Sequence, residues 1–452
     1  MTAKSITEDN DEMINDDVSS EMVDSSVLDE SKLAALKAKS LAKKKERDMA
    51  SKIVAPKTRT LNFGVVGSGF AGSKLAASFY ELGYAAVAFN TALQDLQTIS
   101  IPDSNKLVLT NGIGGASKEL SLGEAAAIEH SDAILALVND KLASCDVLLF
   151  TTSLGGGSGS GSAETVINLL SQTGKPVICL CVLPMASEDL ACKSNSLQTL
   201  SKLSELVQSN ILANLIVVDN ARIETLFSGV SQFEFFSLAN KAIVEPIDML
   251  NQLSNKASDA KVIDGMEFTK LLLNSGGLTS YGELTIENLE DETSIASAVV
   301  ENLDNNLLAS GMDLSQTKYI GFAVCANSNT WKSISATAIH YAKTMVMDSA
   351  KNSEAVFDGS YVLEHIEDGK VIIYSIYSGL GLPKQRVEEL KVEVKSLQEK
   401  TKDRETNRKA SLDVGLDNKS VSQADLLKKK LQNKTSTFGK FVSSSNIRDR
   451  RN

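Results

Sequence analysis

A run of seven small residues is the part of this chain best suited to chemistry. It consists of Gly155, Gly156, Gly157, Ser158, Gly159, Ser160 and Gly161. It follows the apolar segment 147–150, which predicts a buried strand, and it precedes residues 163–170, which predict a helix. Uncovered backbone amides and the positive end of a helix dipole attract anions. The run therefore predicts a phosphate-binding loop, because a flexible linker does not usually join a buried strand to a helix.

Two further glycine-rich stretches follow predicted strands. The strand at 61–66 leads into Gly67, Ser68, Gly69 and Gly72, and the strand at 107–109 leads into 111–117, which contains Gly114, Gly115 and Ala116. Ligands of open parallel sheets bind at the carboxyl ends of the strands, where all three loops would lie. Three loops that converge on one phosphate chain favour a nucleoside triphosphate over a dinucleotide.

A dinucleotide-binding fold remains an alternative, because Gly67, Gly69 and Gly72 have the spacing of its fingerprint. An NAD(P)-dependent oxidoreductase would place an acidic residue at the end of the second strand, where this chain has Asn90 and Thr91. A Walker-type Gly-Lys-Ser/Thr motif is absent. A nucleotide-binding module that does not polymerise also stays open.

Two acidic residues, Asp264 and Glu267, follow a long predicted helix. Two carboxylates at this spacing suit the orientation of a water for in-line attack on a γ-phosphate. Acidic residues are also common at ordinary helix N-termini, and the spacing alone favours that interpretation. The five cysteines and three histidines show no metal-ligand spacing, and no metal site made by protein side chains is predicted.

The elements that must position these residues alternate between strands and helices. Strand patterns at 61–66, 85–89, 107–109, 147–150, 176–183 and 214–218 predict an α/β fold with a mostly parallel sheet and helices on both faces. A long helix follows from 232, with Pro246 as a kink or break. Strands at 319–325, 355–362 and 370–377, with helices near 294–309 and 334–349, predict a smaller α/β domain.

The predicted organisation has seven segments. They are a disordered charged extension at 1–58 with a helix near 31–48, a nucleotide-binding domain at 59–231, a central helix at 232–260, an acidic loop and following helix at 261–283, a second domain at 284–383, a C-terminal helix at 384–402 and a basic disordered tail at 403–452.

The charge of the chain is segregated. The net charge of -11 combines an acidic segment at 1–30, basic segments at 31–60 and 384–452, and an acidic remainder between them. Lys428, Lys429 and Lys430 make the tail suited to nucleic acid or an acidic partner. The acidic N-terminus does not resemble a signal peptide, and no apolar run reaches the roughly 20 residues of a membrane span. We expect a cytoplasmic protein with no membrane partner.

The run at 155–161 resembles the signature of the tubulin/FtsZ superfamily, and the surrounding motifs occur in a similar order over residues 60–380. The resemblance implies GTP and GDP as ligands with Mg²⁺ as cofactor. Asn90 and Thr91 match an Asn-Thr pair of the family, although Ala92 stands where its division proteins have Asp. Residues 111–117 resemble the loop that senses the terminal phosphate. Glu188 falls where the family has a ribose-binding Glu, with Cys192 in place of an Arg.

The resemblance also implies a guanine site. Asn220 matches an Asn that reads the guanine edge, Phe236 an aromatic residue that stacks on the base, and Asn240 an Asn that bonds to it. Phe236 and Asn240 are four residues apart on one predicted helix and therefore share a face. A place in the core is the alternative for Phe236.

Residues 262–267 resemble the family loop that enters the nucleotide site of the next subunit. The resemblance implies that Asp264 and Glu267 position the attacking water for a neighbouring subunit. Hydrolysis would then require a polymer of this chain with itself.

The C-terminal segment favours one kind of polymer. Division proteins of the superfamily end in a short hydrophobic and acidic peptide, which is absent here. A helix followed by a basic tail is similar to the plasmid- and phage-borne tubulins, the TubZ and PhuZ groups. This implies a filament that segregates or positions DNA, through a DNA-bound adaptor or DNA itself, in a bacterial cytoplasm or a phage-infected host. A division-ring GTPase of the FtsZ type remains the alternative.

Overall fold

The computed structural model describes residues 59–110, 114–227, 229–287, 293–304, 308 and 311–411. In these residues ten strands form one sheet, in the order β3-β2-β1-β4-β5-β6-β7-β10-β8-β9. The strands are β1 (Phe63–Ser68), β2 (Ala85–Asn90), β3 (Lys106–Val108), β4 (Val147–Ser153), β5 (Val177–Leu183), β6 (Asn214–Asp219), β7 (Leu278–Ile286), β8 (Tyr319–Ala326), β9 (Ala355–Val362) and β10 (Val371–Leu380).

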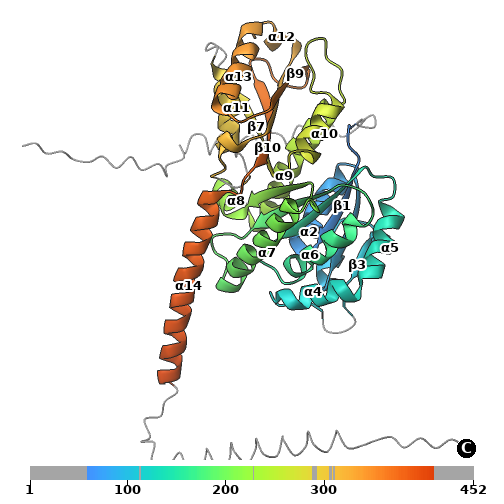
Figure 1. Ribbon diagram of the computed structural model, residues 1–452, viewed down its shortest axis with the longest axis vertical. Helices are drawn as coiled ribbons and strands as arrows, with labels where there is room; N and C mark the ends of the chain where they lie inside the picture. The colour runs from blue at the N-terminus through green and yellow to red at the C-terminus, as the bar shows by residue number, and fades with distance from the viewer. Residues whose placement is uncertain are drawn as a thin grey trace, which may run out of the picture. The chain divides into compact units, whose positions relative to one another are not determined.

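Helices cover both faces of this sheet, and one further helix follows its last strand (Figure 1). They are α2 (Gly69–Glu81), α3 (Leu93–Gln97), α4 (Leu120–Glu129), α5 (Ser131–Lys141), α6 (Ser158–Ser171), α7 (Leu190–Gln208), α8 (Asn220–Leu226), α9 (Gln232–Leu253), α10 (Gly265–Leu273), α11 (Ser294–Asp304), α12 (Ser328–Trp331), α13 (Ala336–Ser349) and α14 (Lys384–Ser411), with short 3₁₀ helices η1 (Asp103–Asn105) and η2 (Leu314–Gln316).

Strands β1 to β7 are parallel, and their central members are buried on both faces. Alternate residues of β1 point to opposite sides, so that Val65 belongs to the core on one face and Val66 to the core on the other. Nearly continuous apolar runs are typical of parallel strands covered by helices on both faces. This part of the fold agrees with the predicted α/β architecture.

The strand order places a topological switch between β1 and β4. The chain proceeds outward from β1 to β2 and β3, then returns to β4 on the other side and continues to β5 and β6. Ligands of such sheets bind in the crevice outside the carboxyl ends of the two strands at the switch. Those ends lead into α2 and α6, and therefore into the glycine-containing residues 67–72 and 155–161.

The second half of the chain extends the same sheet. Strand β7 pairs parallel with β6 through Leu215 and Leu278, and antiparallel with β10 along nearly its whole length. Sequence analysis missed β7, because Thr279, Ser280 and Gly282 interrupt its apolar pattern although its first half is buried. The smaller domain is thus continuous with the nucleotide-binding sheet by hydrogen bonding.

Several element boundaries differ from the predicted ones. Helix α9 runs through Pro246 without a break and ends at Leu253, seven residues before the predicted 260. Residues 278–283, predicted to lie in the segment after the acidic loop, are part of β7. Helix α14 continues to Ser411, past the predicted 402, because its long charged side chains are good helix formers even without an apolar stripe.

Some predictions fall outside the described residues. These are the extension at 1–58, including the helix near 31–48, and the tail from 412 with its lysine cluster. Of the described residues, those up to Leu390 form one compact unit, and those from Lys391 to Ser411 belong to a second unit. None of the described helices has the length and apolar content that a bilayer crossing requires.

Candidate active site

The glycines at the ends of β1 and β4 allow two loops to meet backbone to backbone. Gly69 has φ of +71°, in the left-handed region, and a Cβ at this position would lie 2.8 Å from the Gly159 amide nitrogen. A Cβ on Gly72 would overlap the carbonyl oxygen of Thr151. The two predicted phosphate loops therefore form one continuous surface in which larger residues do not fit.

The third loop joins the same surface. A Cβ on Gly157 would lie 2.7 Å from Cβ of the buried Ala116, and one on Gly114 would lie 3.0 Å from the Thr91 carbonyl oxygen. The Gly115 amide donates to that carbonyl at 3.0 Å. The described residues of the loop, 114–117, thus lie where the sequence predicted. Residues 111–113 lie outside the described residues.

Helix α6 begins earlier than predicted. It starts at Ser158 rather than near 163, so Ser158 to Gly161 form its first turn. Its N-cap residue Gly157 supplies no side-chain acceptor, and the first amides of a helix lack intrahelical partners. A Cβ on Gly156 would meet only Ser153 Oγ, at 4.0 Å, so the space beside this residue is open. An uncapped helix N-terminus beside open space is suited to a phosphate.

Asn90 and Thr91, at the end of β2, differ in their surroundings. The Thr91 hydroxyl hydrogen-bonds to the Ser158 hydroxyl, so Thr91 belongs to the phosphate surface. The buried Asn90 amide donates to Asp95 Oδ2 at 2.8 Å and accepts from the Ala92 amide at 3.3 Å. Asn90 therefore organises the turn into α3.

Lys118 lies beside the predicted ribose residue, and sequence reasoning missed it. Its Nζ donates to Glu188 Oε2 at 3.3 Å and to Asp189 Oδ2 at 2.9 Å. Asn195 Nδ2 donates to the carbonyl oxygens of Lys118 at 2.7 Å and Gly155 at 3.3 Å. The only sequence signal was a lysine directly after a glycine-rich loop. These contacts connect the third loop, Glu188 and the glycine run.

Cys192 stands where the family has an arginine, but its thiol does not supply the positive charge of that arginine. A Cβ on Gly155 would overlap its Sγ, so the thiol packs directly under the glycine run. Burial raises the pKa of the Cys192 thiol to about 12, and the group is therefore neutral at pH 7. Asp189 caps α7 by accepting from the Cys192 amide at 3.0 Å; this bond, together with Lys118, lowers the pKa of Asp189.

The residues predicted to bind guanine lie at the end of β6 and the start of α9. Asn220 is the first residue of α8, and Asp219 caps that helix by accepting from the Ala221 amide at 3.1 Å. Phe235 packs edge-on against Phe227, with ring centroids 6.4 Å apart. Phe236, by contrast, is 48% exposed. Phe235 therefore takes the core position, and the core alternative for Phe236 is wrong.

Asn240 follows Phe236 by one turn of α9 and is half-buried. The two residues thus keep the predicted common face of the helix. The exposed aromatic ring and the amide are the two groups of this turn that suit a purine base.

Asp264 and Glu267 form a capping box at the start of α10. The Glu267 amide donates to Asp264 Oδ1 at 2.8 Å, and the Asp264 amide donates to Glu267 Oε2 at 3.0 Å. Each carboxylate therefore accepts a hydrogen bond from the backbone amide of the other residue. The interpretation of these acids as an ordinary helix N-terminus is correct for the single chain.

The capping box lies at the opposite end of the sheet from the glycines. A Cβ on Gly265 would lie 3.0 Å from Cγ2 of Thr60, which precedes β1, whereas the glycine surface follows β1. At the other end of α10, Asn214, the first residue of β6, donates to the Leu272 carbonyl at 2.8 Å. Six residues of β1 span about 20 Å. One chain therefore does not bring its own acids to its own glycine surface.

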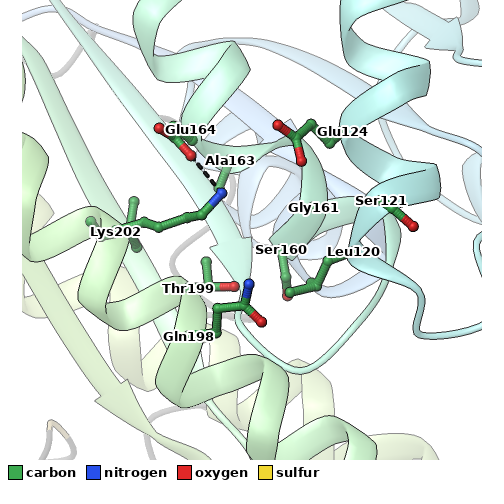
Figure 2. A pocket seen from close by; sticks show the side chains of 11 residues that line it. Leu120, Ser121, Glu124, Ser160, Gly161, Ala163, Glu164, Gln198, Thr199 and Lys202 are labelled. Atoms are coloured by element: carbon green, nitrogen blue, oxygen red, sulfur yellow. Dashed lines mark ion pairs between the residues drawn. The ribbon is translucent and has the colours of Figure 1, made fainter.

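A cavity of about 150 Å³ lies beside the first turn of α6, but it is not the nucleotide site (Figure 2). Ser160 and Gly161 form part of its wall. Its charged groups are Glu124, Glu164 and Lys202, with Lys202 Nζ 2.6 Å from Glu164 Oε2. Two carboxylates against one ammonium do not suit a triphosphate.

Within the described ranges no three His, Cys, Asp or Glu side chains gather closely enough to hold a metal ion. Mg²⁺ usually keeps several waters and is bound through phosphates with few protein ligands, so this arrangement remains compatible with it.

Comparison with known families agrees with this geometry. Residues 37–227 match the model of the Tubulin/FtsZ family, GTPase domain, and residues 249–391 match that of the Tubulin/FtsZ-like protein TubZ-like, C-terminal domain. The chain belongs to the tubulin/FtsZ family. It is a GTPase of the TubZ group and binds GTP and GDP. This assignment favours GTP hydrolysis over the dinucleotide oxidoreductase.

Two curated relatives show how the similarity is distributed. The tubulin-like protein TubZ of Bacillus cereus is 23% identical over 378 residues, which cover 77% of this chain and 86% of that protein. The cell division protein FtsZ of Aquifex aeolicus is 30% identical over 167 residues, 36% of this chain and 43% of that one. The similarity to TubZ thus extends over much more of the chain.

Solved structures of TubZ share the fold. The GTPγS-form protofilament of TubZ from Bacillus thuringiensis serovar israelensis gives a TM-score of 0.69 at 21% identity, and covers 78% of this chain and 95% of that one. A helical model of a two-stranded TubZ filament gives 0.71 at 22% identity, with coverage of 81% and 95%.

Proposed function

We propose that this GTPase polymerises into filaments and that its active site is completed between two subunits. The observation that carries this proposal is the separation of the glycine surface and the Asp264–Glu267 box at opposite ends of β1. A head-to-tail neighbour would bring the acids of one copy to the nucleotide of the next. The related TubZ structures are protofilaments and filaments, which supports self-assembly.

The proposed reaction is an in-line displacement on the γ-phosphate of GTP. The amides at the start of α6, with Thr91 and Ser158, hold the phosphate chain, and Asp264 and Glu267 of the neighbour orient a water and accept its proton. The water oxygen forms a bond to the γ-phosphorus as the bond to the β–γ bridging oxygen breaks, which releases GDP and phosphate. Mg²⁺ would neutralise charge on the phosphates, bound by their oxygens and by the hydroxyls of Thr91 and Ser158.

The remaining roles follow from position. Phe236 would stack on guanine, and Asn220 and Asn240 would bond to its edge. Glu188 would accept from a ribose hydroxyl, with Lys118 holding it in place. We also propose that the chain is divided as predicted, with a nucleotide-binding domain at 59–231 and a second domain at 284–383 among its segments.

The concentration dependence of hydrolysis tests the shared site. The GTPase rate per subunit should rise steeply above a threshold protein concentration, and Asp264→Ala should give filaments that persist with GTP. Electron microscopy with GTP and with GTPγS would be paired with phosphate release. A rate per subunit that does not depend on concentration would exclude the shared site.

We also propose that the filament segregates or positions DNA in the cytoplasm of a bacterium or of a phage-infected host. The C-terminal match is to a TubZ-like domain, and one related structure is described as that of a "type III plasmid segregation TubZ". The basic residues after 411, Lys428 to Lys430 among them, would contact a DNA-bound adaptor or DNA. A division ring of the FtsZ type is the second candidate, because FtsZ relatives match the GTPase half.

Cosedimentation of filaments with duplex DNA, with and without residues 412–452, separates direct DNA binding from binding through an adaptor. Loss of DNA from the pellet of the shortened chain supports direct binding. Equal DNA with both chains would exclude the tail as the DNA contact.

A further inference from the structure

A buried ion pair joins the first turn of α14 to the end of β6. The Nε atom of Arg386 lies 2.9 Å from Asp219 Oδ2, and both side chains are 4% exposed. Arg386 is the third residue of α14, and Asp219 is the last residue of β6. The pair therefore connects the start of the C-terminal helix to the strand end that carries the proposed guanine contact.

Asp219 uses its second oxygen on the helix that begins with Asn220. Oδ1 accepts from the Ala221 amide at 3.1 Å and caps α8. The position of one carboxylate is thus defined from two sides, by Arg386 and by the first turn of α8. A cap fixes the direction in which a helix starts, and Asn220 is its first residue.

We propose that Arg386 is a positioning residue for guanine recognition, acting through Asp219 to hold Asn220 at the start of α8. This inference rests on the proposed role of Asn220. Removing one partner of a buried ion pair leaves an uncompensated charge in the interior, and the remaining group moves or becomes neutral. Without Arg386 the Asp219 carboxylate would leave the cap, and Asn220 would lose its orientation.

The electrostatics of the pair agree with this dependence. Burial raises the pKa of Asp219, and the Arg386 guanidinium opposes that rise. Arg386 thus favours the charged form of a buried carboxylate next to the proposed base site.

The molecule contains a matched control at its other end. The Nε atom of Arg59 lies 2.6 Å from Asp248 Oδ1, with side chains 13% and 4% exposed. Asp248 also accepts from the Tyr84 hydroxyl at 2.9 Å and from Gln252 at 2.7 Å. This pair is also a buried Arg–Asp pair, but Arg59 precedes β1 and Asp248 lies near the C-terminal end of α9, away from the glycine surface.

The test measures affinity for GDP and for ADP by competition against a fluorescent GDP analogue. In Arg386→Met the preference for GDP over ADP should fall about tenfold, with ADP affinity unchanged because the phosphate surface is intact. Arg386→Lys should lose less. Arg59→Met should lower the Tm but change GDP affinity less than twofold.

A double variant distinguishes positioning from a general structural role. In Asp219→Asn with Arg386→Met, the amide oxygen still accepts from the Ala221 amide and needs no cation, so the GDP preference should recover. Wild-type preference in Arg386→Met, no recovery in a folded double variant, or an equal loss in Arg59→Met would each overturn the proposal. If Arg386→Met does not fold, unchanged preference in Arg386→Lys overturns it.

A wild-type chain that binds GDP and ADP equally would instead contradict the proposed guanine site itself.

Discussion

The two ends of β1 carry the two halves of the proposed reaction, and they are built in different ways. The glycine end is backbone packed against backbone, with no room for a Cβ at Gly72 or Gly157. The acid end consists of two side chains, Asp264 and Glu267, at an exposed helix start. In the proposed reaction, binding is thus part of the interior of the fold, whereas hydrolysis depends on side chains at the surface.

The largest expected effect is on the acid end. Asp264→Asn should lower the GTPase rate of the polymer by about 10² to 10⁴-fold, because the amide does not accept the water's proton. GTP affinity and Tm should hold, since Asn caps a helix as well as Asp. Phosphate release above the assembly threshold measures the rate.

Asp313→Asn is the control for this change, because Asp313 is also an N-cap, accepting from the Ser315 amide at the start of η2, and its replacement should leave the rate unchanged. If Asp264→Asn also lost GTP binding, binding and hydrolysis would not be divided between the two ends of β1.

The glycine end should respond in stability and binding together. In Gly72→Ala the new methyl overlaps the Thr151 carbonyl, and overpacking of this kind costs about 1–3 kcal/mol. Urea unfolding and GTP titration should both show the loss. Gly156→Ala meets only Ser153 Oγ at 4.0 Å and should keep its stability. Equal loss of stability in the two variants would show that crowding is not the cause.

Met266 should affect assembly alone. It lies between the two acids, is 78% exposed, and would be covered by the next subunit. Full burial of such a side chain contributes about 1.5–3 kcal/mol, so Met266→Ser should raise the critical concentration about tenfold. Met347→Ser, on α13 and 51% exposed, should not change it. Sedimentation at a series of concentrations measures both, and equal values would place Met266 outside the contact.

The smallest expected effect is at Cys192. Its thiol should react with iodoacetamide at pH 8 only after unfolding, because reaction requires the thiolate and burial holds the pKa near 12. Between about pH 9 and 12 the unfolded thiol ionises while the folded one stays protonated, so this group makes stability fall as pH rises through that range. Mass spectrometry of native and urea-treated protein gives the reaction rates. Rapid native labelling would mean that the glycine end opens.

The fold was predictable where pattern and propensity agree. The glycine runs and the strands before them gave the crevice between β1 and β4, and the spacing of Phe236 and Asn240 gave their common face. The start of α6 was not predictable, because Ser and Gly are poor helix formers and packing against Leu120 and Ala116 overrides their propensity. Strand β7 was missed because its buried residues include Thr279 and Ser280.

The other features that could not be predicted are contacts between residues that are far apart in the sequence. Asp264-x-x-Glu267 has the sequence of a capping box, but no pattern showed that it lies beside Thr60, before β1. The partners of Asp219 and Glu188 were equally hidden, because Arg386 and Lys118 are far from them in sequence. A short-range pattern contains no information about such contacts.

The placement of glycines and acids at opposite ends of each subunit has a consequence for the number of sites in the proposed protofilament. A single head-to-tail protofilament of n subunits would hold n nucleotides but have only n−1 complete sites. The last nucleotide, at the end that presents glycines to solvent, would have no carboxylates over it and would stay GTP until another subunit arrives. The two tips would therefore differ chemically, and a growing protofilament would carry an unhydrolysed GTP at one of them.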